Sequence, residues 1–230
     1  MIQKRHKYTL LIGLVLLWNS ATFAQQVKWD STARPDVYKA QVELFRSLPH
    51  SRMDIVFLGN SITFWAAWND LLGDLRYKNR GIPGDITFGV LERLDEVIDG
   101  KPAKVFILIG INDLARQIPD DVILENYRRM VRRLKAGTPK TRIYFQTLLP
   151  TNDTFQKLKN HYNKEKNIQY LNQALKEMAP REGFEVIDLH AHFVDEAGKL
   201  RKEYTWDGVH LTLAGYQKWA EMLRKGKYIP

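Results

Sequence analysis

The residues of this chain best suited to chemistry are a serine, Ser61, and an Asp-x-x-His pair, Asp207 and His210. A serine hydroxyl becomes a nucleophile at neutral pH only when a base lies within hydrogen-bond reach. His210 can serve as that base, and Asp207 can hold one imidazole nitrogen while the other faces Ser61. We expect the spacing of three to place Asp207 and His210 on the same side of a helical turn. Taken alone, Ser61 and Asp207 also fit helix caps, and His210 a surface position.

Gly84 and Asn112 could supply hydrogen-bond donors to the same reaction. The tetrahedral intermediate of acyl transfer carries negative charge on the former carbonyl oxygen, so donors must already point to that position. Gly84 allows close approach of the backbone, Asn112 carries an amide, and the backbone N–H of Ser61 completes the oxyanion hole. A turn glycine and an asparagine that satisfies backbone groups at a strand–helix junction are the simpler interpretations of Gly84 and Asn112.

Short apolar runs alternate with longer amphipathic stretches, a pattern that predicts βαβ units and an α/β fold with a parallel sheet covered on both faces. We expect strands near 54–58, 77–79, 104–109, 142–147 and 184–188. We expect helices over about 35–47, 64–75, 86–98, 120–136, 164–179 and 212–225. Ligands of open α/β sheets bind outside the carboxyl ends of the strands. Because Ser61, Gly84 and Asn112 each follow a strand closely, we expect them to meet at one edge of the sheet.

These blocks, in this order, resemble the SGNH hydrolases, also called GDSL-type esterases and lipases, and within them the platelet-activating-factor acetylhydrolase-like branch. The four residues in the family's name correspond here to Ser61, Gly84, Asn112 and His210. The resemblance implies a three-layer α/β/α, flavodoxin-like fold with a central parallel five-stranded sheet over residues 25–230. It also implies a Ser-His-Asp mechanism that needs no metal and no cofactor.

The resemblance implies a serine esterase that forms an acyl-enzyme on Ser61, and we expect a short-chain (acetyl) esterase acting on acetylated carbohydrate. The expected partner is therefore a small-molecule or glycan ester. A lipase, lysophospholipase or thioesterase of the same fold is the alternative enzyme, and a non-catalytic glycan-binding module is the alternative from another class. The first block departs from the family in having Asn60 where aspartate is usual. Since asparagine keeps the carbonyl acceptor, we expect catalysis to survive.

Aromatic and basic residues beside these blocks are candidates for substrate binding. Trp65 and Trp68 lie soon after Ser61 and could line an acyl pocket or stack on a sugar, although core packing is an alternative for either. Arg80 and Arg116 flank the proposed oxyanion residues and could meet a negatively charged substrate or pair at the surface.

The N-terminus predicts export. Residues 1–24 combine a basic start, an apolar stretch and a small-residue site ending at Ala24, which is typical of a cleaved signal peptide. We therefore expect a secreted or periplasmic protein without stable membrane anchoring after cleavage, an uncleaved anchor being the alternative. A lipoprotein anchor is excluded because the chain has no cysteine.

The net charge of +9 raises the question of an acidic partner. Arginines in the densest basic run, 128–135, alternate with apolar residues at helical spacing, which predicts a solvated helix face rather than a nucleic-acid site. His190 and His192 lack further ligands, so we expect no metal site there. The polar stretch 150–167 fits either a functional loop over the sheet edge or a surface excursion.

Overall fold

The computed structural model describes residues 29–229, so the predicted signal peptide lies outside the described residues. A five-stranded sheet forms the centre, with strand order β2-β1-β3-β4-β5 and every neighbouring pair parallel. This confirms the predicted fold class. The strands are β1 (Ile55–Gly59), β2 (Tyr77–Gly81), β3 (Lys104–Leu108), β4 (Arg142–Gln146) and β5 (Glu185–Ile187).

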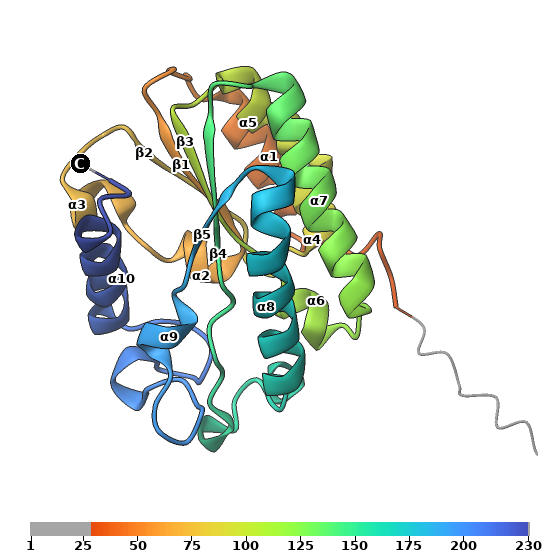
Figure 1. Cartoon of the computed structure of the whole chain (residues 1–230), viewed down its shortest axis with the longest axis vertical. Coiled ribbons are helices and arrows are strands. Elements are labelled where there is room, and N and C mark those ends of the chain that lie inside the picture. Colours follow the sequence, from red (N-terminus) through yellow and green to blue (C-terminus); the bar gives the residue numbers. More distant parts are fainter. Residues whose placement is uncertain (1–28, 230) are drawn as a thin grey trace, which may run out of the picture.

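Helices cover both faces of the sheet (Figure 1). On one face lie α1 (Tyr38–Ser47), α4 (Thr87–Glu92), α5 (Leu94–Gly100), α7 (Asp120–Gly137) and α8 (Glu165–Glu182). On the other lie α3 (Trp68–Leu72), α9 (His190–Phe193) and α10 (Leu213–Lys225). Two short helices, α2 (Ser61–Phe64) and α6 (Ile111–Ala115), begin close to the ends of β1 and β3.

The core is built on aromatic side chains stacked across adjacent strands. Phe57 of β1, Phe106 of β3 and Tyr144 of β4 occupy paired positions, with ring centroids 5.0 and 4.8 Å apart. Trp68 of α3 stacks on Phe57 at 3.7 Å and packs edge-on against Trp219 of α10. Because offset and edge-on arrangements of large rings bury much apolar area, this stack fixes α3 and α10 on the sheet.

The prediction of one continuous helix over 64–75 is wrong. The chain forms α2 and α3 with a break between them, because the Asn79 amide of β2 donates to the backbone carbonyls of Thr63, Phe64 and Ala66. Carbonyl groups at the end of a helix have no N–H donor in the next turn. Here the Asn79 side chain, which is distant in sequence, supplies the missing donor. The predicted helix 86–98 is likewise divided into α4 and α5 at Arg93.

The basic run forms a solvated surface of α7, as predicted. Tyr127, Met130 and Leu134 are buried, whereas the arginines between them point outward, and Arg132 pairs with Glu182 of α8 at 2.8 Å. Within residues 29–229, no helix combines the length and apolar character needed to cross a bilayer.

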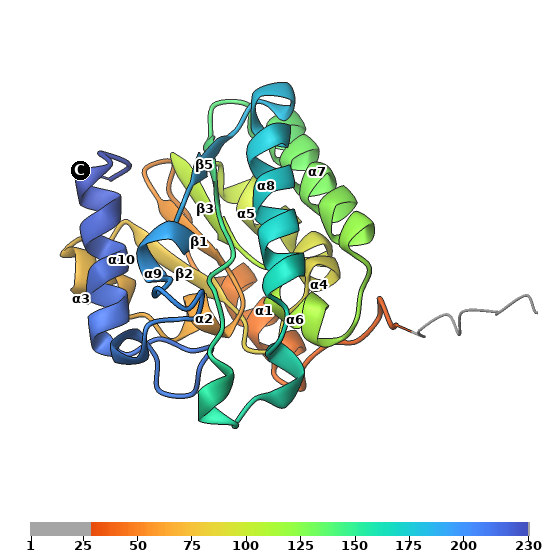
Figure 2. The same cartoon turned by 60° about the horizontal axis from the view of Figure 1, so that its bottom comes forward.

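The strand order creates a crevice at the carboxyl ends of β1 and β3. In the sheet, β2 lies on one side of β1 and β3 lies on the other. The connections that follow β1 and β3 therefore run toward opposite edges of the sheet. Such a reversal leaves a gap between the loops that follow the two strands. Ser61 follows β1 and Asn112 follows β3, so the fold places them on either side of this gap, at the end of the sheet that Figure 2 turns toward the viewer.

We expect Trp68→Ala to lower the free energy of unfolding by about 3–5 kcal/mol, the cost typical of removing a buried aromatic ring. Trp68 is 1% exposed and touches both the sheet and α10. Urea denaturation of the purified variant measures the change. Trp65→Ala is the matched control, since Trp65 is 58% exposed and its loss should change stability by about 0.5 kcal/mol or less. Equal losses in both variants would contradict this account of the core.

Candidate active site

The structure brings Ser61, His210 and Asp207 into one hydrogen-bonded chain. The Ser61 Oγ lies 2.8 Å from the His210 Nε2, and the His210 Nδ1 lies 2.6 Å from the Asp207 Oδ2. An ionised carboxylate only accepts, so Nδ1 carries the hydrogen and Nε2 of the neutral ring accepts from the serine hydroxyl. The serine is therefore placed to lose its proton to the imidazole as it attacks a carbonyl carbon.

The expectation of a helical turn between Asp207 and His210 is wrong. The Asp207 Oδ1 instead accepts from the backbone N–H groups of Val209 and His210, at 2.9 and 2.7 Å, while Gly208 takes a left-handed φ of +87°. An aspartate that binds the backbone two and three residues ahead makes a tight local turn. The same carboxylate thus shapes the turn with one oxygen and orients the imidazole with the other.

The charge on Asp207 is maintained despite its enclosure. Burial raises the pKa of this carboxyl, but hydrogen bonds from the His210 side chain and from the backbone N–H groups of His210 and Val209 outweigh burial, so the net pKa lies below its ordinary value. A carboxylate held in its ionised form stabilises the imidazolium that forms when His210 takes a proton.

Asn60, and not Ser61, caps α2. The Asn60 Oδ1 accepts from the backbone N–H of Ile62 at 3.0 Å, which leaves the Ser61 hydroxyl available to His210. The simpler interpretation of Ser61 as a helix cap is therefore contradicted. Since a helix cap needs only an oxygen acceptor, asparagine can cap α2 in place of the aspartate that is usual here.

The predicted oxyanion donors lie around the same crevice. Ser61 is the first residue of α2, so its N–H has no partner within the helix. Gly84 has a left-handed φ of +79°, and its N–H donates to no other group among residues 29–229. The Asn112 Nδ2 donates one hydrogen to the Asp85 carbonyl at 2.8 Å, which leaves its second hydrogen for a ligand. The arrangement can hold a developing oxyanion between two loops.

Two buried carboxylates join the loops that carry these donors. Arg93 lies with its Nε 3.0 Å from the Asp85 Oδ2 and donates through its terminal nitrogen to the Gly59 carbonyl at 3.0 Å. Asp113 accepts from the backbone N–H and the hydroxyl of Thr87 at the start of α4. Burial raises the pKa of Asp113 to about 7, although the hydrogen bonds from Thr87 oppose the shift. The ends of β1, β2 and β3 are thus tied together beneath the site.

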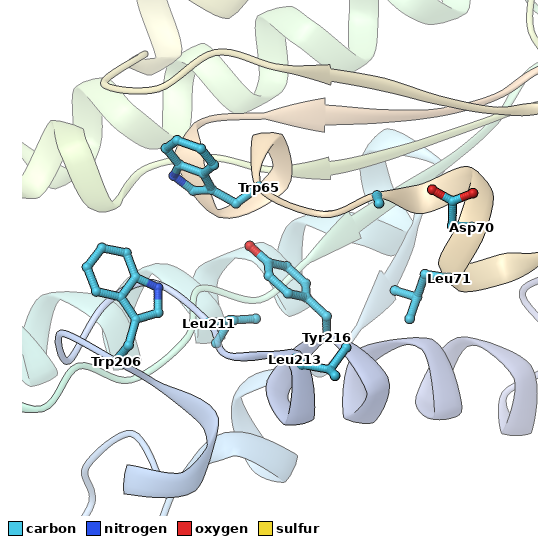
Figure 3. A pocket seen from close by; sticks show the side chains of 8 residues that line it. Trp65, Asp70, Leu71, Trp206, Leu211, Leu213 and Tyr216 are labelled. Atoms are coloured by element: carbon cyan, nitrogen blue, oxygen red, sulfur yellow. The ribbon is translucent and has the colours of Figure 1, made fainter.

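A pocket of about 680 Å³ lies between the α3 segment and the start of α10 (Figure 3). Trp65 and Trp206 lie at one end and are 58% and 50% exposed. The Trp206 ring stacks on the His210 imidazole with centroids 5.3 Å apart, and the Tyr216 hydroxyl donates to the Ile62 carbonyl, one residue after Ser61. One wall of the pocket, the Trp206 indole, therefore lies directly against the His210 imidazole. The remaining lining residues are Ala67, Asp70, Leu71, Leu211 and Leu213.

Two of the four candidates for substrate binding, Trp68 and Arg80, are corrected by the structure. Trp68 is enclosed in the core, where its Nε1 donates to the Thr63 carbonyl. Arg80 is 4% exposed and forms a 2.6 Å ion pair with Glu96 of α5. Neither side chain has a surface to offer to a ligand. Of the four, only Trp65 lines the pocket, and Arg116 is exposed outside it.

The polar stretch 150–167 packs against the site. The backbone N–H of Asn152 donates to the Gly208 carbonyl at 2.8 Å, and a Cβ at Gly208 would lie 2.1 Å from the Asn152 oxygen. The buried Tyr162 donates its hydroxyl to the Asp207 carbonyl, and the His161 Nε2 lies 3.0 Å from the Asn112 Oδ1. This stretch is therefore a wall of the site and not a detached surface excursion.

Sequence reasoning missed His161, Trp206 and Arg93. The sequence offers one sign for each of the first two residues. His161 stands beside Tyr162 inside a polar stretch, and Trp206 directly precedes Asp207. Arg93 offered none, because its partners become neighbours only when the sheet forms. Among residues 29–229, no group of three or more histidine, cysteine or acidic side chains could hold a metal ion.

We expect Asp207→Asn to lower kcat for an aryl acetate by roughly 10⁴-fold, because the neutral amide no longer fixes the imidazole tautomer or stabilises its charge. The amide oxygen can still accept from Val209 and His210, so the turn should persist. Steady-state kinetics measure the loss, and circular dichroism checks the fold. Asp99→Asn, an exposed change on α5, is the control and should retain full activity. A tenfold loss or less in Asp207→Asn would contradict the assigned geometry.

Comparison with known proteins agrees with this site. The model of the GDSL-like lipase/acylhydrolase family matches residues 57–218. The platelet-activating factor acetylhydrolase IB subunit alpha2 of Rattus norvegicus is 27% identical over 172 residues, covering 72% of each chain.

Solved structures show the same relationship. A protein from Streptococcus pneumonia whose description names platelet activating factor is 31% identical with a TM-score of 0.75, covering 82% of this chain and 92% of its own. A GDSL-like lipase from Bacteroides thetaiotaomicron is 27% identical with a TM-score of 0.69, covering 84% and 98%. The resemblance expected from the four sequence blocks is confirmed, and this chain belongs to the GDSL-like lipase/acylhydrolase family, a family of carboxylic-ester hydrolases.

Proposed function

We propose that Ser61 is the nucleophile of an acetylesterase that acts on acetylated carbohydrate. His210 takes the proton from the Ser61 hydroxyl as Oγ attacks the ester carbonyl carbon, and Asp207 stabilises the imidazolium. The intermediate collapses when the C–O bond to the alcohol breaks and His210 returns the proton to the leaving oxygen. Water then attacks the acyl-enzyme by the same route and releases the carboxylic acid.

The N–H groups of Ser61 and Gly84 and the free hydrogen of the Asn112 amide are the proposed oxyanion donors. Each lies at the carboxyl end of the sheet and none has to break an existing bond to serve. Donors that are in place before the reaction avoid the cost of reorganising water around the developing charge. Loss of one such donor typically lowers turnover by about 10²- to 10³-fold.

The observation that carries the substrate proposal is the pocket beside His210. A space of about 680 Å³ between two half-exposed indoles holds far more than an acetyl group. We assign it to the alcohol part of the substrate, since Trp65 and Trp206 present flat faces on which a sugar ring can stack. We assign the acyl group to the side of Asn112, where the His161 imidazole lies 3.0 Å from the buried amide. The acetylhydrolase name of the relatives also favours a short acyl group.

A lipase or lysophospholipase is the second candidate, because the same pocket also has an apolar wall. Leu71, Leu211 and Leu213 line it, and Leu213 is largely exposed. An alkyl chain would bury this surface as well as a sugar would. The two candidates differ in which substrates they hydrolyse fastest.

We also propose that the protein is exported and that the mature chain begins after Ala24. The basic, apolar and small-residue segments of residues 1–24 support this assignment. The intact mass of protein recovered from the secreting host should equal that of residues 25–230. A mass that includes the first 24 residues would contradict cleavage.

For an acetylesterase, we expect kcat/KM for p-nitrophenyl esters to be highest with acetate and to fall roughly tenfold or more by octanoate, because longer acyl groups do not fit beside Asn112. Acetate release from acetylated xylo-oligosaccharides provides the carbohydrate measurement. Ser61→Ala, measured in parallel, should release no acid. A rate that climbs with chain length would establish the lipase alternative, and binding without turnover in the unaltered protein would establish a glycan-binding module.

Trp65→Ala should raise KM for an acetylated oligosaccharide about tenfold, while KM for p-nitrophenyl acetate changes by about twofold or less. The reason is that only the oligosaccharide reaches far enough to stack on this indole. Trp29 lies outside the pocket lining, and Trp29→Ala is the matched control, expected to leave both KM values unchanged. Parallel increases for the two substrates would remove Trp65 from carbohydrate recognition.

A further inference from the structure

We propose that His161 is a positioning residue for the oxyanion donor Asn112. His161 ends a short 3-10 helix, η2 (Lys159–His161), in the segment between β4 and α8. Its Nε2 lies 3.0 Å from the Asn112 Oδ1. The inference rests on the proposed role of Asn112 in ester hydrolysis and adds a residue to that site.

The hydrogen-bond pattern fixes which atom donates. The Asn112 Nδ2 donates to the Asp85 carbonyl, so the other end of the amide is the oxygen, and that oxygen only accepts. The His161 Nε2 must therefore carry the hydrogen, and in the neutral ring Nδ1 is left as an acceptor. Nδ1 is enclosed and has no hydrogen-bond partner within the described part of the chain.

The surroundings of His161 favour this neutral form. Burial lowers the pKa of His161, and a positive charge on His210 lowers it further. A second proton would have to go to the enclosed Nδ1, where no acceptor waits. The imidazole is thus held as a single-proton donor that is aimed at Asn112.

Two partners then hold the Asn112 amide at both ends. The His161 imidazole binds its oxygen and the Asp85 carbonyl binds one of its hydrogens, so rotation of the amide plane is restrained. The remaining hydrogen is the one that can reach an oxyanion. A hydrogen bond to the amide oxygen also polarises the amide and strengthens donation from its nitrogen. His161 therefore acts through Asn112 without touching the substrate.

The segment that carries His161 is anchored independently of the imidazole. Tyr162 is buried, and its hydroxyl binds the Asp207 carbonyl and accepts from the backbone N–H of Leu158. Asn152 binds the Leu200 carbonyl through its side chain. Replacement of the imidazole should therefore leave the backbone of the segment in place, which makes the proposal open to test by substitution.

The test is a double-substitution cycle with p-nitrophenyl acetate as the substrate. The variants are His161→Leu, which removes the donor, His161→Gln, whose side-chain amide can still donate to Asn112, Asn112→Ala, and the double variant Asn112→Ala with His161→Leu. His192→Leu is the matched control, because His192 is an exposed histidine of α9, away from Asn112. Thermal unfolding of each variant monitors the fold.

We expect His161→Leu to lower kcat about tenfold with KM changed by about twofold or less, the scale of one lost hydrogen bond. His161→Gln should recover most of the rate. In the Asn112→Ala background, His161→Leu should cause almost no further loss, because the group it positions is gone. His192→Leu should retain full activity.

Equal loss from His161→Leu with and without Asn112 would overturn the proposal, since the histidine would then support the fold or another group. So would a full rate in His161→Leu, or a glutamine variant as slow as the leucine variant. Failure of the carbohydrate assignment leaves this test intact, because the aryl acetate requires only an esterase. An unaltered protein that hydrolyses no ester would refute the proposed function itself.

Discussion

A buried ion pair between Arg93 and Asp85 organises the end of the sheet on which the site depends. Both side chains are almost completely enclosed, and the guanidinium also reaches the Gly59 carbonyl at the end of β1. Burial raises the pKa of Asp85, and the adjacent Arg93 opposes that shift. Removal of one partner from such a pair typically costs about 3–5 kcal/mol, because the other is left charged and unpaired. The pair therefore ties the end of β1 and the junction of α4 and α5 to the loop that follows β2.

The position of this arginine explains a feature of the helices around it. Arg93 lies at the junction of α4 and α5, where the backbone departs from helical geometry. From that junction its side chain can pass beneath the loop that carries Gly84 and meet β1. Asp113 of α6, the helix that follows β3, performs a similar task by binding the start of α4. The proposed oxyanion donors are thus positioned by buried ionisable groups that lie behind them, which is how a preorganised site is supported.

The sequence predicts the fold class and the catalytic candidates well because both depend on local patterns. The apolar runs that precede Ser61 and Asn112 predict strands from their own residues, and both runs form strands of the sheet. The errors at Trp68 and Arg80 have a different origin, since their burial is decided by Phe57, Trp219 and Glu96, which are distant in sequence. The helix break after α2 likewise requires the Asn79 amide to arrive from β2. His161 could not be singled out for the same reason, because its role is defined by Asn112 across the crevice.

Ser61, the proposed nucleophile, and His210, its proposed base, are 149 residues apart in the sequence. Contacts of such long range form late, after the intervening strands have paired and the ordering entropy of the loop has been offset. A growing or truncated polypeptide that stops before the turn at residues 207–210 contains Ser61 but lacks the imidazole beside it. Ester hydrolysis by this molecule therefore requires that synthesis has passed residue 210 and that the folded sheet has brought Ser61 and His210 together.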